Sequence, residues 1–109
     1  MEVGELRPVI DRAKDYDAVL LDSLTLWVSR RLESGGEEDV LMALEDFLDI
    51  ASALATPFVL VSDEVGLGVV PETREGRTFR DVLGSANQRV AAVAEEVHLC
   101  VAGVGVRIK

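Results

Sequence analysis

The hydrophobic positions of this chain recur with two different periods. Apolar residues spaced three and four apart predict amphipathic helices, and short uninterrupted apolar runs predict buried strands. The helical period covers residues 3–16, 23–34, 37–55 and 78–96. The apolar runs cover residues 17–22, 56–62, 97–103 and 104–109. Pro8 lacks an amide proton, so we expect it in or near the first turn of the first helix.

The order of these segments predicts an α/β fold. Strands that alternate with long helices form mostly parallel sheets, so we expect a three-layer arrangement with helices on both faces. No helix separates the last two strands, which should therefore form an antiparallel hairpin through Gly103 to Gly105. A chain of 109 residues makes one domain at most, and we assign residues 1–109 to it.

Composition and charge exclude two classes of partner. The formal net charge is −9 and the isoelectric point is about 4.5. Domains that bind nucleic acid are normally basic, and an anionic membrane surface would repel this chain. No apolar run has the length of a signal peptide or a transmembrane helix, so we expect a cytoplasmic protein. Cys100 lies inside an apolar run and is expected to be a buried thiol.

Acidic residues follow two of the expected strands directly. The run VLLD ends on Asp22, and FVLVS leads into Asp63 and Glu64. Ligands of parallel α/β sheets bind at the carboxyl ends of the strands, where these three carboxylates should meet. Four apolar residues closing on an acid resemble the Walker B strand, whose acid holds Mg²⁺. The alternative is that Asp22 only caps the helix that follows it.

The segment after the second acidic strand end carries arginines. Arg74, Arg77 and Arg80 suit phosphate recognition, because a guanidinium group binds two phosphate oxygens at once. The alternative is a solvated loop whose arginines pair with nearby acids. His98 is the only histidine and stands between two apolar residues, so we expect a structural role for it.

Long stretches of the chain resemble one enzyme family. The run from VSDEVGLGVVPETREGRTFRDVLGSANQ to the end of the chain is similar to the C-terminal half of the adenosylcobinamide kinase / adenosylcobinamide-phosphate guanylyltransferase family. DAVLLDSLTLWVSRRL resembles the segment that precedes it. One departure is Asp63, where the family pattern has asparagine. This change adds a negative charge beside Glu64 and puts the local hydrogen-bond scheme in question.

The resemblance implies a function in cobalamin biosynthesis. Enzymes of the family phosphorylate adenosylcobinamide with ATP or GTP and Mg²⁺, then transfer GMP from GTP through a guanylyl-histidine intermediate. Their fold is of the phosphate-loop, RecA-like type, and they assemble as trimers. This sequence contains no G-x-x-x-x-G-K-[ST] motif and no histidine that matches the nucleophile. We therefore expect an N-terminally truncated version of that fold, inactive alone; the alternative is a non-catalytic module that oligomerises or complements a separate piece.

The resemblance also suggests site residues. Glu2 matches an acid that contacts the guanine nucleotide, and Asp22 matches the Walker B acid close to nucleotide and magnesium. Glu64, Arg74 and Arg80 are expected on the rim of the substrate pocket.

Overall fold

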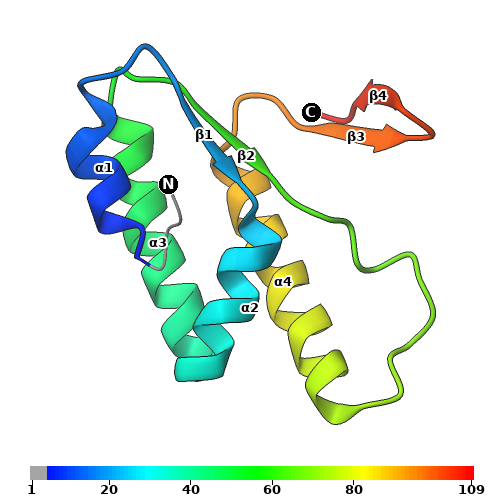
Figure 1. The fold of residues 1–109 in the computed structure, drawn as a ribbon. Coiled ribbons are helices and arrows are strands. Elements are labelled where there is room, and N and C mark those ends of the chain that lie inside the picture. Colours follow the sequence, from blue (N-terminus) through cyan, green and yellow to red (C-terminus); the bar gives the residue numbers. More distant parts are fainter. Residues whose placement is uncertain (1–4) are drawn as a thin grey trace.

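The computed structural model describes residues 5–109, so the site expected at Glu2 lies outside the described part. The chain forms four helices and four short strands in that part (Figure 1). In chain order they are α1 (Arg7–Ala13), β1 (Val19–Asp22), α2 (Leu24–Ser34), α3 (Glu37–Ala53), β2 (Phe58–Val61), α4 (Arg74–Val93), β3 (His98–Val101) and β4 (Val104–Arg107). This order matches the one that the sequence predicts.

Local side-chain chemistry explains where the helices begin. Pro8 lies in the first turn of α1, as expected. The Ser23 hydroxyl caps α2 by accepting a hydrogen bond from the Leu26 amide at 3.2 Å. The Thr73 hydroxyl caps α4 by accepting one from the Gly76 amide at 3.0 Å. Three acids in the first turn of α3 favour its N-terminus through the helix dipole.

The strands form two separate pairs. β1 and β2 are parallel, with Val19 opposite Phe58 and Asp22 opposite Val61. β3 and β4 form an antiparallel hairpin that turns at Ala102 and Gly103, both at positive φ. The fold class is thus α/β with a parallel pair and the expected C-terminal antiparallel strand. A continuous three-layer sheet is not formed by residues 5–109.

The hydrophobic core lies on one side of the β1–β2 pair. Leu21 points into it with Phe58 and Leu60, while Leu20 and Val59, the alternate residues, point away and are exposed. α2, α3 and α4 fill the core with aliphatic side chains. The fully buried residues of largest volume are Leu24, Leu44, Leu83, Val28, Val40 and Val82. No helix of the described part covers the opposite face of the β1–β2 pair (Figure 1). We call this face, formed by Leu20, Asp22, Val59 and Val61, the bare face.

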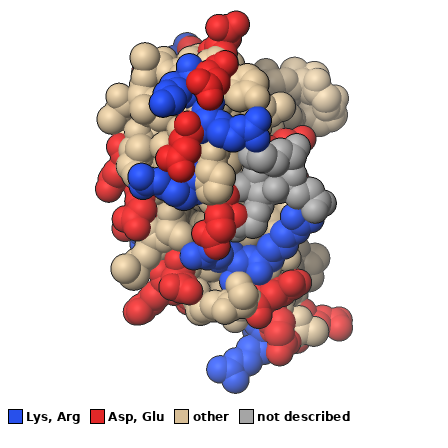
Figure 2. All heavy atoms as spheres, turned by 60° about the vertical axis from the view of Figure 1, so that its left-hand side comes forward, with Lys and Arg blue, Asp and Glu red and all other residues tan. Residues whose placement is uncertain are grey.

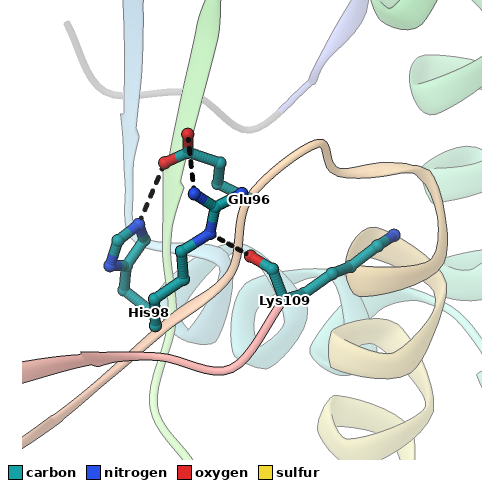
Figure 3. A network of polar contacts seen from close by, with 4 residues as sticks. Glu96, His98 and Lys109 are labelled. Carbon is teal, nitrogen blue, oxygen red and sulfur yellow. Dashed lines mark hydrogen bonds and ion pairs between the residues drawn. The ribbon is translucent and has the colours of Figure 1, made fainter.

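The hairpin is attached to the rest of the chain through polar contacts. Glu96 accepts from His98 Nε2 at 3.1 Å and lies 3.6 Å from Arg107 Nη1 (Figure 3). Lys109 Nζ donates to the carbonyl of Ala91 at 2.7 Å, at the C-terminus of α4. A cation there complements the helix dipole. The Glu96 contacts lie within the hairpin and the residues that lead into it, so Lys109 makes the side-chain contacts that join the hairpin to α4. No hairpin residue belongs to the described apolar core.

Two expectations from the sequence are wrong in detail. Cys100 is exposed, because the hairpin that carries it is not covered. α4 begins at Arg74, four residues before the expected start at Thr78, because Thr73 supplies a cap.

Candidate functional site

The parallel pairing of β1 and β2 brings the acidic strand ends together. Asp22 is the last residue of β1 and stands opposite Val61, the last residue of β2. Asp63 and Glu64 follow at the same edge within three residues of Val61. The structure therefore places the three acids at one end of the parallel pair, as the sequence predicts.

Strand geometry directs Asp22 away from the helices. Side chains alternate between the two faces of a strand, and Leu21 occupies the buried face. Asp22 therefore shares the bare face with Leu20, and it is exposed. The alternative role as a helix cap is wrong, since Ser23 caps α2. The Asp22 carboxylate is therefore accessible to a ligand on the bare face of the β1–β2 pair.

A hydrogen-bonded chain fixes the end of β2 between two helices. The Ser62 hydroxyl donates to Asn87 Oδ1 at 2.6 Å, and Asn87 Nδ2 donates to the carbonyl of Asp63 at 3.0 Å. The Asp63 amide donates to Thr25 Oγ1 at 3.0 Å. Asn87 belongs to α4 and Thr25 to α2, so both helices hold the backbone just beyond the strand. This arrangement positions the acidic strand end.

The asparagine-to-aspartate departure at residue 63 leaves this scheme intact. Both contacts of Asp63 use its backbone, which is the same for either side chain. Glu64 is engaged by its own loop, because its Oε1 accepts from the Gly66 amide at 2.6 Å. The extra charge at Asp63 therefore changes the electrostatics of the edge and not its backbone geometry.

The arginines expected on the rim lie along α4 rather than in a loop. Arg74 and Arg80 precede Asn87 by thirteen and seven residues. At a rise of about 1.5 Å per residue they lie about 20 Å and about 10 Å along the helix from the strand end. The structure does not bring either of them to Asp22.

The local contacts of these arginines differ. Arg80 pairs with Asp81 at 3.0 Å, and Arg77 donates to the carbonyls of Pro71 and Glu72, both at 3.0 Å. Among the described residues Arg74 makes no hydrogen bond or ion pair, and it is exposed. The alternative, pairing with nearby acids, therefore describes Arg80 in the described part of the chain, whereas Arg77 binds backbone carbonyls.

Two hollows in the described surface lie away from these acids. One of about 250 Å³ opens between α1, α2 and α3, and none of the three acids lines it. Trp27 lines it, and its Nε1 is buried without a hydrogen-bond partner in the described part of the chain. Figure 2 turns this side of the molecule forward and shows acidic and basic side chains interspersed over it. Such mixing gives no single-sign patch for steering a charged ligand.

Two absences apply to the part of the chain that the structure describes. No group of three or more His, Cys, Asp or Glu side chains within residues 5–109 is arranged to hold a metal ion. None of the helices in this range is long and apolar enough to cross a membrane.

Comparison with known proteins identifies the family. The model of the family described as cobinamide kinase / cobinamide phosphate guanyltransferase matches residues 1–108. The chain belongs to this family. The resemblance noted from the sequence is thereby confirmed, and it extends over essentially the whole chain.

Three relatives of this chain are named as bifunctional proteins of adenosylcobalamin biosynthesis. The bifunctional adenosylcobalamin biosynthesis protein CobU of Salmonella typhimurium is 44% identical over 91% of this chain. The protein of the same name from Escherichia coli is 42% identical over 85%. The bifunctional adenosylcobalamin biosynthesis protein CobP of Pseudomonas aeruginosa is 34% identical over 84%. The chain spans only 61%, 59% and 53% of the lengths of these relatives, so it corresponds to a portion of each.

Sequence reasoning located the acids at the strand ends but missed the residues that hold the backbone there in place. Thr25, Ser62 and Asn87 connect α2, β2 and α4, although they are far apart in the sequence. One signal was that Ser62 and Asn87 both lie in the run that resembles the family, VSDEVGLGVVPETREGRTFRDVLGSANQ. A single sequence does not reveal which distant backbone group such a side chain will meet.

Proposed function

We propose that this chain is the portion of an adenosylcobinamide kinase and adenosylcobinamide-phosphate guanylyltransferase that supplies the acidic strand end beside the nucleotide. The whole enzyme would phosphorylate adenosylcobinamide with ATP or GTP and then transfer GMP from GTP to that phosphate. The description of the family names both activities, and the relatives are named as bifunctional proteins of adenosylcobalamin biosynthesis, which supports the proposal. The observation that carries the assignment of this portion is Asp22, exposed at the carboxyl end of a parallel strand and directed to the bare face.

Asp22 fits the proposed role as a magnesium ligand. Mg²⁺ keeps much of its coordination shell as water and phosphate oxygens, so it needs only one or two protein carboxylates. A single acid on a short strand, without a cluster of three, meets that need. When bound, the ion would offset the charge of the triphosphate, which the acidic strand end would otherwise repel.

The other site residues have different support. The nucleotide contact proposed for Glu2 lies outside the described residues. Glu64 follows the end of β2, and its Oε1 accepts from the Gly66 amide, so its second carboxylate oxygen is the one that would meet a substrate. Arg74 and Arg80 would border the pocket only for a ligand, or a neighbouring subunit, that extends along α4.

The wider assignments follow from the family. We propose a RecA-like, phosphate-loop fold for the whole enzyme, a trimeric assembly and a cytoplasmic location. The loop between β2 and α4 gives some support to assembly, because Val69 is 95% exposed and its apolar neighbours Leu67 and Val70 are exposed too. Burial of such exposed apolar side chains against a partner is favourable, because it removes apolar surface from water.

Activity assays test the assignment of this portion. We expect no transfer of GMP from labelled GTP by the purified 109-residue chain. Phosphoryl and nucleotidyl transfer depend on precise positioning of the phosphates, which the lysine and backbone amides of a phosphate loop provide, and this sequence contains no such motif. Co-expression with the part of the Salmonella protein that lies outside the aligned region should restore transfer. In that complex Asp22→Asn should reduce the rate about a hundredfold or more, as found when a group that stabilises transition-state charge is removed.

Asp49→Asn is the matched control, since Asp49 is an exposed acid on α3 that accepts a hydrogen bond from Ser52 through its backbone carbonyl. It should leave transfer unchanged. GMP transfer by the isolated chain, or full activity of the Asp22→Asn complex, would contradict the proposal.

A second candidate is a non-catalytic module that oligomerises. The exposed apolar loop at Leu67, Val69 and Val70 favours it. Light scattering on the purified chain separates the two: a stable oligomer with no gain of activity on complementation supports the module, and a clean monomer opposes it.

A further inference from the structure

Asp22 belongs to the last residue pair of the β1–β2 sheet. Each strand is four residues long, and Asp22 stands opposite Val61 at the end of both. The terminal pair of a short sheet opens more readily than an internal pair, because strand neighbours hold it from one side only. The position of the Asp22 carboxylate therefore depends on what holds the chain just beyond this pair.

The chain continues differently beyond the two strand ends. After β1 it enters α2 at once, because Ser23 caps the helix and Leu24 is its first, buried residue. After β2 it runs through residues 62–73, which form neither helix nor strand, before α4 begins at Arg74. The packing of α2 thus fixes the end of β1, whereas the end of β2 depends on other contacts.

The backbone of Asp63 continues the alternation of β2 past the end of the sheet. The Val19 amide donates to the Pro57 carbonyl at 2.9 Å, so the polar backbone group of Pro57 is directed toward β1. The residues of a parallel strand that bond to one neighbour alternate, so the amides of Val59, Val61 and Asp63 have this direction too. Because β1 ends opposite Val61, the Asp63 amide lies beyond the last pair of the ladder.

Side chains of two helices bond the backbone of Asp63 instead. Thr25 Oγ1, in the first turn of α2, accepts from the Asp63 amide at 3.0 Å. Asn87 Nδ2, on α4, donates to the Asp63 carbonyl at 3.0 Å, and Asn87 Oδ1 accepts from the Ser62 hydroxyl at 2.6 Å. We call the side chains of Thr25 and Asn87 the clamp. It joins α2, the end of β2 and α4.

The clamp acts locally. All three of its hydrogen bonds end on Ser62 or Asp63, which directly follow the terminal pair. The described apolar core, which joins α2, α3 and α4, includes neither Thr25 nor Asn87. Loss of the clamp should therefore loosen the strand end more than it weakens the fold.

We propose that Thr25 and Asn87 are positioning residues for Asp22: they keep the Asp22–Val61 pair closed and so hold the Asp22 carboxylate where the transfer reaction uses it. The inference rests on the proposed function for the reaction itself. The clamp bonds end on Ser62 and Asp63, so the clamp acts on Asp22 through the backbone of β2. Misplacing a reacting group by about 1 Å can cost about a hundredfold in rate, so this distant contact matters to the chemistry.

Hydrogen exchange on the 109-residue chain tests whether the clamp keeps the terminal pair closed. Asn87→Ala and Thr25→Val should each speed exchange of the Val61 amide at least about tenfold, because the strand end then opens without the rest of the sheet. The Val59 amide lies inside the sheet and should change less than about twofold. Thr25→Val keeps the shape of the side chain and removes the acceptor, whereas Thr25→Ser keeps the acceptor and should retain the protection of Val61.

Gln88→Ala is the matched control for Asn87→Ala. Gln88 is the next residue of α4, it is exposed, and it also carries an amide side chain. Its truncation should leave both the exchange of the Val61 amide and the transfer of GMP unchanged.

Transfer kinetics test whether the clamp serves the reaction. The chain is co-expressed with the part of the Salmonella protein outside the aligned region. Asn87→Ala should lower kcat at least about tenfold and leave KM for GTP within about twofold, because it misplaces a group that acts in the transition state. Adding Asn87→Ala to Asp22→Asn should lower kcat no further than Asp22→Asn alone, since Asn87 acts through Asp22. A merely structural loss would add to the effect of Asp22→Asn.

Three results would overturn the inference: unchanged exchange of Val61 in Asn87→Ala and Thr25→Val, an unchanged kcat of Asn87→Ala in an active complex, or additive losses in the double variant. The failure of the proposed function looks different. An unmodified complex that transfers no GMP contradicts that function, and the exchange of Val61 then decides alone whether the clamp holds the strand end at Asp22.

Discussion

At the scale of single residues, the geometry of the candidate site depends on side chains that carry no charge. Asn87 bonds to both Ser62 and Asp63, and Thr25 holds the Asp63 amide. The acids themselves make few contacts: Asp22 is exposed, and Glu64 bonds only within its loop among the described contacts. Neutral groups thus fix the backbone, and the carboxylates stay available for a ligand.

Asn87→Ala should therefore lower the free energy of unfolding by about 1–2 kcal/mol, because two hydrogen bonds of about 0.5–1.5 kcal/mol each are lost. Urea denaturation of the purified chain measures this. Asp63→Asn serves as the control and should stay within about 0.5 kcal/mol of the unmodified chain, since the Asp63 bonds come from its backbone. Equal losses for both variants would show that the network is not what holds the strand end.

At the scale of elements, α4 connects the site to the hairpin. Its 20 residues begin at the Thr73 cap and end where Lys109 Nζ donates to the Ala91 carbonyl. Asn87 joins it to the end of β2, and Arg89 forms an ion pair with Glu45 of α3. α4 therefore contacts the backbone just beyond β2 through Asn87 and the end of the hairpin through the Ala91 carbonyl.

Gly84→Ala should stabilise α4. Glycine inside a helix costs about 0.5–1 kcal/mol relative to alanine, and a methyl group at Gly84 meets no described atom outside the helix's own backbone. Thermal and urea unfolding of the isolated chain should show a gain of that size.

Gly76→Ala in the same helix is the control with the opposite sign. A methyl group there would lie 2.9 Å from both Pro71 Cβ and Thr73 Oγ1, so the cap must shift. A gain in stability for Gly76→Ala, or a loss for Gly84→Ala, would contradict the packing described for α4.

At the scale of the whole molecule, the chain is packed on one side and open on the other. Its Cα radius of gyration is 14.2 Å. A compact domain of this length is expected at about 13 Å. The hairpin and the loop between β2 and α4 both extend away from the helices (Figure 1). The core is therefore a helical cluster against one face of β1–β2, with the hairpin outside it.

Leu44→Ala and Val104→Ala should separate these two regions. Leu44 is completely buried, and its truncation should cost about 2–5 kcal/mol. Val104 is 63% exposed, so its truncation should cost under about 0.5 kcal/mol in the isolated chain. Urea denaturation measures both, and a large loss for Val104→Ala would show that the hairpin packs against the helices.

Much of the secondary structure could be predicted because its causes are local. Apolar spacing located all four helices, and apolar runs located all four strands. The start of α4 was missed because the arginines around it resemble a loop, while the Thr73 hydroxyl supplies the cap. The burial of Cys100 was predicted wrongly. An apolar run indicates that burial of the strand would be favourable, but it does not show that another element packs against it.

The sequence alone determined the family, the order of the elements and the acids that follow the strands, since these depend on residue type and spacing along the chain. The tertiary structure decided which strands pair, which face Asp22 occupies and which helices hold the end of β2. It also placed Arg74 and Arg80 along α4, away from the acids. The reason is physical: contacts such as those of Asn87 join groups that are distant in the chain, and they exist only once the helices have packed.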